Sequence, residues 1–280
     1  MKPYQGTPFD LEGRTALITG AGGLLGRQHA AALAAVGARV LLTDLDVATA
    51  EAAAAEVRRE IADADLVPLR LDVTNPESVR AVAEDAARRF GAVDVLVNNA
   101  AIDPKVTSAP GMTHGSRLEA FGVDQWNREI AVGLTGAMLC AQTFGAAMAG
   151  RRTGVILNIA SDLGVIAPDQ RLYRRADAAT EAEQPVKPVT YSVIKHGLVG
   201  LTKYLATYWA DRNVRVNALS PGGVYNQQDP AFVARLTHLI PMGRMADRTD
   251  YRGIVQFLCS DASRYMTGQN VVIDGGRSVW

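Results

Sequence analysis

Short apolar segments alternate with longer segments of helical periodicity along most of the chain. The apolar segments are bounded by turn-forming residues, which is typical of strands. They predict strands over residues 14–19, 38–43, 66–71, 93–98, 155–159, 214–219 and 270–273. The helical spacing predicts helices over residues 25–36, 49–61, 124–149 and 191–210, and another that begins at 74–77. This order indicates an α/β fold with one doubly wound parallel sheet of about seven strands and helices on both faces.

Two of the predicted helices carry boundary signals. Gly37 follows the first helix, at a position where a left-handed residue commonly ends a helix. Thr74 and Glu77 have the spacing of a capping box, and Pro76 between them suits a first helical turn. These residues predict where the first helix ends and where the helix after the third strand begins.

Two segments interrupt the alternation of strands and helices. Residues 103–123 are rich in Pro, Gly and Thr, and residues 165–189 are polar and charged. Loops of this length in a compact domain are usually functional or disordered. Both follow predicted strands, and ligands of such sheets bind at the carboxyl ends of the strands. Since no clean linker separates two units, we expect a single domain over 1–280.

Composition narrows the class of protein. Hydrophobic residues make up 48% of the chain, enough for a sizeable core, and the formal net charge of zero argues against a nucleic-acid partner. The apolar runs are too short to span a bilayer, and residues 1–10 do not resemble a signal peptide, so we expect a cytoplasmic protein. Cys140 and Cys259 lie in apolar helical patterns, which predicts buried free thiols and neither a disulfide nor a metal site.

A glycine-rich turn between the first strand and the first helix predicts a dinucleotide site. Backbone must approach a pyrophosphate closely there, and the helix N-terminus offers free N–H groups. Strand, turn and helix together are typical of a Rossmann-type sheet, whereas the turn alone would be a weak signal. The predicted cofactor-binding residues of this turn are Gly20, Gly22, Gly23, Leu24, Leu25 and Gly26.

Asp44, at the end of the second strand, predicts the kind of dinucleotide. A carboxylate there accepts hydrogen bonds from the adenosine ribose hydroxyls and repels the 2′-phosphate of NADP, which favours NAD. The alternative is an aspartate that only caps the following turn. Asp72 and Val73, after the third strand, are predicted to face the adenine ring. Small residues after the fourth strand let the backbone pass beside the cofactor, and the predicted contacts are Asn99, Ala100 and Ala101.

Several motifs in a fixed order resemble those of the short-chain dehydrogenase/reductase family, over about residues 10–276. They are TGAGGLLG (19–26), LDV (71–73), VNNAA (97–101), NIAS (158–161), YSVIK (191–195), SPGGV (220–224) and TGQNVVIDGG (267–276). The resemblance implies that Ser161, Tyr191 and Lys195 are catalytic, and that Tyr191 and Lys195 also contact the cofactor. It further implies nicotinamide contacts at Pro221, Gly222, Val224 and Asn226, and a substrate lid near 222–245.

The sequence departs from the family pattern at several places. Leu24 stands at the middle glycine of the usual phosphate turn, and Ala101 where a glycine is usual. Gly133 aligns with the family's catalytic asparagine, whose backbone carbonyl commonly holds a water that reaches the active lysine. Glycine keeps that carbonyl but loosens the helix. The chain between Ser161 and Tyr191 also contains an insert, which is either a solvated surface loop or a flap that grips substrate or contacts a subunit.

The function implied is hydride transfer between NAD and a secondary alcohol or ketone. A weaker resemblance, to bacterial members tied to surface-sugar and nonulosonic-acid pathways, favours a polyol, sugar or sugar phosphate. One alternative is an apolar alcohol or ketone of steroid or acyl type. Another, which rests on Gly133, is a catalytically silent NAD(H)-binding protein.

The resemblance also implies an assembly. The family forms dimers and tetramers through its two long helices and its C-terminal strand, so we expect a homotetramer or homodimer. Small residues would permit close helix packing, and they are Gly133, Gly136, Ala137, Gly197 and Gly200. The terminal aromatic, Trp280, is expected to be exposed unless it docks against a neighbour.

Overall fold

A parallel seven-stranded sheet forms the centre of the molecule. The computed structural model describes residues 7–102, 115–175, 178 and 180–280. The strands are β1 (Thr15–Thr19), β2 (Arg39–Asp44), β3 (Leu66–Arg70), β4 (Val95–Asn98), β5 (Gly154–Ile159), β6 (Val214–Pro221) and β7 (Asn270–Ile273). Their order across the sheet is β3-β2-β1-β4-β5-β6-β7, and every neighbouring pair is parallel. The expected doubly wound α/β sheet is confirmed.

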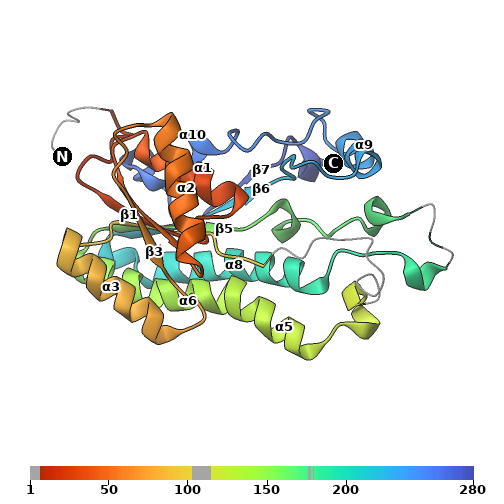
Figure 1. Cartoon of the computed structure of the whole chain (residues 1–280), viewed down its shortest axis with the longest axis horizontal. Coiled ribbons are helices and arrows are strands. Elements are labelled where there is room, and N and C mark those ends of the chain that lie inside the picture. Colours follow the sequence, from red (N-terminus) through yellow and green to blue (C-terminus); the bar gives the residue numbers. More distant parts are fainter. Residues whose placement is uncertain (1–6, 103–114, 176–177, 179) are drawn as a thin grey trace.

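Helices cover both faces of the sheet (Figure 1). One face carries α1 (Leu24–Ala34), α2 (Val47–Glu60) and α10 (Arg252–Cys259). The other carries α3 (Pro76–Phe90), α5 (Val123–Ile130), α6 (Gly136–Cys140), α7 (Ala146–Arg151) and α8 (Val189–Tyr208). Helix α9 (Pro230–His238) lies apart from both layers, at the end of the molecule where the segment after β5 also lies (Figure 1).

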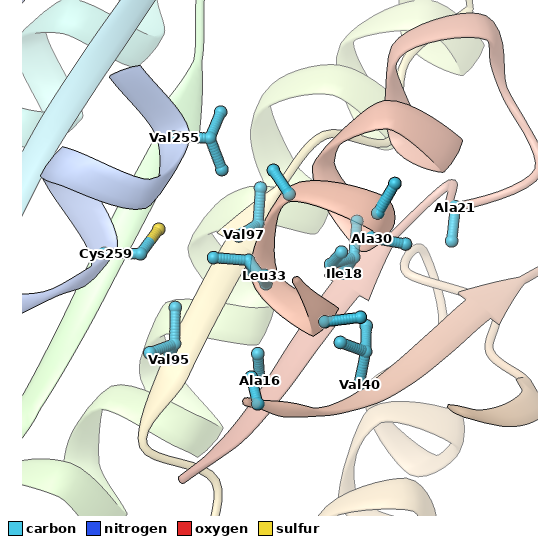
Figure 2. Close-up of a cluster of buried hydrophobic side chains, with 14 of the residues drawn as sticks. Ala16, Ile18, Ala21, Ala30, Leu33, Val40, Val95, Val97, Val255 and Cys259 are labelled. Carbon is cyan, nitrogen blue, oxygen red and sulfur yellow. The ribbon is translucent and has the colours of Figure 1, made fainter. Parts of the chain in front are cut away.

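Alternate side chains along the strands point to opposite faces of the sheet and form two hydrophobic cores. Ala16 and Ile18 of β1 pack beneath α1 and α10, whereas Leu17 between them faces α3 and α8. This follows from the strand geometry, in which successive side chains point to opposite faces. Figure 2 shows the first core, where Leu33 of α1 and Val255 of α10 lie over the strands. Because both faces are covered, the central positions of the strands are mostly apolar, and polar residues lie chiefly near the strand ends and in β6.

The helix predicted over 124–149 is one continuous helical run, Val123–Arg151. Two π-helical segments, Ala131–Thr135 and Ala141–Gly145, lie between α5, α6 and α7. By length and composition the run is apolar enough to cross a membrane, and part of it is buried inside the protein. This corrects the expectation that the apolar runs are too short. The core helix of a soluble protein passes the same test, and this run packs on the sheet, α3 and α8.

Two of the predicted helix-boundary signals are confirmed, and one is wrong. Gly37 has φ +90° just after α1, as expected. Pro76 stands in the first turn of α3, but the N-cap is Asn75, whose side chain accepts from the backbone N–H groups of Glu77 and Ser78. The predicted capping box from Thr74 is therefore wrong. The Thr74 hydroxyl donates to Asp72 Oδ1 at 2.7 Å instead, because the chain is still in a turn there.

The glycines expected to allow close packing between subunits mostly pack within the chain. A Cβ on Gly133 would lie 2.8 Å from Ile194, and one on Gly197 would lie 2.9 Å from Leu134. Both contacts join the run Val123–Arg151 to α8. The small residues on these two helices therefore bring the two helices together.

Desolvation shifts the pKa values of two buried thiols and one buried imidazole. Cys140 and Cys259 are free and buried, as predicted, and burial raises the pKa of each thiol to about 12. His29 of α1 is fully buried, neither ring nitrogen has a hydrogen-bond partner, and burial lowers its pKa from 6.5 to about 4. Burial disfavours the imidazolium, so His29 is neutral in the folded state.

The buried His29 predicts acid sensitivity. The folded-state pKa lies below the unfolded value, so stability is complete above pH 6.5 and is lost as pH falls toward about 4. Roughly 2 kcal/mol of unfolding free energy should disappear between about pH 7 and about pH 5 through this residue. Urea unfolding at both pH values should show a smaller drop for His29→Gln than for the parent chain. The exposed His238→Gln is the control, and equal drops in all three proteins would contradict the assignment.

Candidate active site

The predicted phosphate turn lies between β1 and α1, as the sequence indicates. Gly20 has φ +60°, and a Cβ there would lie 2.8 Å from the Cα of Ala100. A Cβ on Gly26 would lie 2.5 Å from the carbonyl oxygen of Gly20. Gly23 is the N-cap of α1 and has no side chain to satisfy the first N–H groups. A turn with these properties leaves backbone donors at a helix N-terminus, which suits a pyrophosphate.

Asp44 lies beside this turn at the end of β2. Its Oδ2 accepts from the backbone N–H of Gly22 at 3.1 Å. The helix that follows is capped by Asp46, whose side chain accepts from Ala48. Asp44 is therefore not the cap of α2, and its carboxylate binds the glycine turn instead. The sheet register also pairs Asp44 with Arg70 of β3, a cation that sequence proximity did not reveal.

Residues after β4 are tied to the same turn through Thr19. The Thr19 hydroxyl accepts from the backbone N–H groups of Asn99 and Ala100, each at 3.0 Å. The Asn99 side chain donates to the carbonyl oxygens of Thr19 and Gly20, each at 2.9 Å. These bonds hold the VNNAA segment, including the exposed Ala101, against the glycine turn. The residues present thus fit a dinucleotide that crosses the ends of β1 and β4.

The three predicted catalytic residues lie together at the end of β5. Lys195 is buried, and its Nζ donates to the carbonyl oxygen of Ile159 at 2.8 Å. That nitrogen lies 5.5 Å from the centroid of the Tyr191 ring, one helical turn earlier on α8. Ser161 follows β5, lines the same cavity as both, and caps a short 3₁₀ turn, Asp162–Gly164. The spacing of four thus places the phenol and the ammonium on one face of α8.

A buried ion pair supports Ser161 from the C-terminal end of the chain. The Ser161 hydroxyl donates to Asp162 Oδ1 at 2.9 Å, and Arg277 donates to Asp162 Oδ2 at 2.7 Å. The side chains of Asp162 and Arg277 are only 4% and 9% exposed. Sequence reasoning missed this pair because its members are far apart in the chain. The only signal is an acidic residue directly after the serine.

The remaining predicted cofactor residues fall into two groups. Asp72 Oδ1 accepts from the backbone N–H and hydroxyl of Thr74, and Val73 packs against Gly136. The second group follows β6 and lines the cavity that holds the predicted catalytic residues. Its members are Pro221, Gly222, Val224 and Asn226.

One cavity of about 970 Å³ joins part of the glycine turn, the predicted catalytic residues and the segment after β6, whereas Asp44, Asp72 and Val73 do not line it. Leu24, Leu25 and Asn99 line its cofactor end, and Ser161, Tyr191 and Lys195 its centre. Its outer wall is formed by α9 and by residues of the insert between Ser161 and Tyr191. The structure thus brings together three sets of residues that the sequence predicted separately.

The described part of the insert packs on the predicted lid. Leu172 is buried with Leu236 and Ile240, and the rings of Tyr173 and Phe232 lie 5.4 Å apart. Arg235 of α9 donates twice to the carbonyl oxygen of Leu172, at 2.8 and 3.0 Å. These contacts argue against a solvated surface loop, because the insert and α9 share a small apolar core. Of the other long loop, residues 103–114 lie outside the described residues.

Comparison with known proteins places the chain in a family. A family model described as enoyl-(acyl carrier protein) reductase matches residues 20–278. The D-threitol dehydrogenase of Mycolicibacterium smegmatis is 33% identical over 276 residues, covering 97% of this chain and 95% of that protein. The 3-oxoacyl-(acyl-carrier-protein) reductase FabG of Thermotoga maritima is 31% identical over 271 residues, covering 95% and 98%.

A solved structure agrees with these matches. The gluconate 5-dehydrogenase of Burkholderia cenocepacia, in complex with NADP and tartrate, superposes with a TM-score of 0.82 at 30% identity, and the match covers 98% of each chain. The class defined is an oxidoreductase of Rossmann-type fold that acts on secondary alcohols and uses a nicotinamide cofactor. The chain belongs to the short-chain dehydrogenase/reductase family.

Removal of Arg277 should destabilise the protein strongly. Arg277→Met leaves the buried Asp162 carboxylate without its cation, which costs about 3–5 kcal/mol of unfolding free energy. Arg212→Met, which breaks an exposed pair with Asp211, should cost less than about 1 kcal/mol. Urea unfolding measures both, and the double variant Asp162→Asn/Arg277→Met should recover part of the loss. A similar small cost for both single variants would refute the role of the buried pair.

Proposed function

We propose that the chain, as a single domain over 1–280, is an NAD-dependent dehydrogenase or reductase of a secondary alcohol or ketone. The observation that carries this is the single cavity shared by the cofactor turn, Ser161, Tyr191 and Lys195. When bound, NAD would accept the hydride from the alcohol carbon, or NADH would return it to the ketone. Tyr191 exchanges the proton of the substrate oxygen, which Ser161 orients by a hydrogen bond.

Lys195 prepares Tyr191 for this exchange. A free tyrosine has a pKa near 10, and a nearby ammonium favours the phenolate. The hydrogen bond from Lys195 Nζ to the carbonyl oxygen of Ile159 holds the lysine side chain in one rotamer. The ammonium charge therefore stays near the Tyr191 ring. We also propose that the same ammonium holds the nicotinamide ribose, as the family resemblance implies.

The substrate we propose is a polyol, sugar or sugar phosphate. The outer wall of the cavity is rich in hydrogen-bond donors from the insert and α9, including Arg174, Arg175 and Arg235. Such groups suit a substrate with many oxygens and would be poorly used by a hydrocarbon. The likeness to a D-threitol dehydrogenase supports the same class.

Two alternative functions give different results in the assay described below. The likeness to a 3-oxoacyl-(acyl-carrier-protein) reductase favours reduction of an acyl-type ketone. A catalytically silent NAD(H)-binding protein rests on Gly133, in place of the family's asparagine. Gly133 lies buried in the π-helical segment of the long helical run, against Ile194 of α8.

We also propose a homotetramer or homodimer in the cytoplasm. Val123 and Met138 on the long helical run, and Val193, Tyr204 and Tyr208 on α8, leave apolar side chains exposed. Such faces suit contact with a second copy of the chain. Trp280 is 77% exposed, although its indole N–H donates to the carbonyl oxygen of Leu239 at 3.2 Å.

Replacement of Tyr191 tests the enzymatic assignment. Tyr191→Phe should lower kcat by roughly 10²–10⁴-fold, because general acid–base transfer is lost. The control is Tyr204→Phe, an exposed tyrosine on the same helix, which should keep full turnover. The assay follows NADH with polyols, sugars and sugar phosphates beside apolar alcohols and 3-oxoacyl thioesters.

The outcomes of this panel separate the candidates. Turnover of the acyl thioester alone would establish the first alternative, and tight NADH binding without turnover of any compound would support the silent protein. A Tyr191→Phe protein with unchanged kcat would sink the role given to Tyr191.

Asp44 should set the cofactor preference. We expect the parent chain to bind NADH more tightly than NADPH, and Asp44→Ser to weaken NADH binding by about tenfold or more, since a charged hydrogen bond is lost. The variant should also bind NADPH better, because Arg70 lies in register with position 44. Asp46→Ser removes the same charge two residues away and keeps a capping side chain, so it should change neither affinity. Preference of the parent chain for NADPH, measured by fluorescence titration, would refute this reading.

A further inference from the structure

A second lysine lies against the phenol of Tyr191. The ammonium nitrogen of Lys187 is 3.9 Å from the centroid of the Tyr191 ring, closer than Lys195 Nζ at 5.5 Å. Lys187 is half-buried and lines the cavity beside Tyr191. It belongs to the insert between Ser161 and Tyr191. The phenol therefore lies within reach of two cations that come from different parts of the fold.

The backbone of Lys187 is held by a side chain from the other arm of the insert. Its N–H donates to Gln170 Oε1 at 2.9 Å, and its carbonyl oxygen accepts from Gln170 Nε2 at 3.3 Å. Gln184 binds Arg175 in the same manner, at 2.8 and 3.0 Å. Each glutamine amide thus pairs with the backbone N–H and C=O of one residue, as a neighbouring strand would. These bonds hold the two arms of the insert together.

The insert is in turn fixed to its surroundings. Arg235 of α9 binds the carbonyl oxygen of Leu172, and Arg117 donates to the carbonyl oxygen of Glu181 at 2.9 Å. Pro188 stands between Lys187 and the first residue of α8, and it restricts the backbone there. The position of Lys187 over the ring is therefore a product of several packed segments.

Other charges near Tyr191 come from every element around the cavity. They are Asp162, Arg174, Arg175, Asp229, Arg235 and Arg277. Asp162 and Arg277 neutralise one another, Asp229 caps α9, and Arg174 lies 3.5 Å from Glu181. The buried Glu129 of α5 accepts from the hydroxyl of Thr190, the residue before Tyr191. On α8 itself, the exposed His196 bonds the carbonyl oxygen of Ser192.

We propose that Lys187 is a second cation that, together with Lys195, stabilises the deprotonated phenol of Tyr191. The proposal rests on the function proposed above for Tyr191. A cation over an aromatic face is attracted by the ring, and the attraction grows when the ring carries a full negative charge. In alcohol oxidation the phenolate takes the substrate hydroxyl proton while the hydride and its electron pair pass to NAD. In ketone reduction both transfers reverse, and no other reactant is needed.

In this role the insert contributes a residue that acts on the phenol of Tyr191. Lys195 is buried and anchored to β5, so its distance from the phenol is fixed by the core. Lys187 lines the cavity, and its position depends on the packing of the insert on α9. The acidity of Tyr191 therefore depends on the packing of the insert on α9.

The test is a direct titration of Tyr191. Tyrosines carrying ¹³C at the ring carbon that bears the hydroxyl are followed by NMR across pH in the full chain, and Tyr191→Phe identifies the signal. Lys187→Gln should raise the pH of half-deprotonation by about one unit. Lys187→Arg keeps the charge and the contact with the ring, so it should titrate close to the parent. Lys203→Gln, on an exposed position of α8, should not shift the signal.

Kinetics supply the second readout. In Lys187→Gln the acid limb of the pH profile for kcat should move to higher pH by the same amount, with the plateau at high pH retained. An unshifted Tyr191 signal in a folded Lys187→Gln protein would overturn the proposal. A shifted signal combined with full turnover by Tyr191→Phe would instead overturn the proposed function while leaving the influence of Lys187 on the phenol in place.

Discussion

Buried polar contacts between α8 and β5 fix the geometry on which the site depends. Lys195 donates to the carbonyl oxygen of Ile159, and deeper in the core Asn158 donates to the Thr202 hydroxyl at 2.8 Å. Asn158 in turn accepts from Asn98 of β4 at 2.9 Å. These contacts stand at two levels along α8, so the helix can neither slide nor rotate without leaving buried polar groups unpaired. Such losses cost about 1–3 kcal/mol each, which makes the placement of Tyr191 a property of the core.

The outer wall of the cavity is formed by segments that are far apart in the sequence. The insert, α9 and the C-terminal residues come from three distant parts of the chain, and each contributes a cation to the cavity. Arg277 is held by Asp162, and Arg235 by the carbonyl oxygen of Leu172. The apolar contact of Leu172 with α9 then joins the insert to the lid. The outer wall of the cavity is thus built by contacts among distant segments, whereas Tyr191 and Lys195 are placed by the packing of α8 on the sheet.

Much of the fold was predictable because its signals are local. Apolar strands covered on both faces, the glycine turn and the spacing from Tyr191 to Lys195 each depend on neighbours in sequence. The register of Asp44 with Arg70, and the contact of Arg277 with Asp162, depend on how separate segments come together, so no local pattern announces them. The capping error at Thr74 had a related cause. Asn75 competes for the same role, and only the backbone conformation decides between them.

Packing gives a structural reason for glycine at position 133, where the family pattern has asparagine. A Cβ at this position would lie 2.8 Å from Ile194, a residue inside the YSVIK segment itself. An asparagine there would require a stiff, β-branched side chain on α8 to move, and that side chain lies next to Lys195. The reciprocal contact of Gly197 with Leu134 fixes the spacing of the two helices from the other side. Glycine at position 133 therefore allows the long helical run and α8 to pack closely together. It lies in a π-helical segment, where the usual i→i−4 pairing of backbone groups is altered.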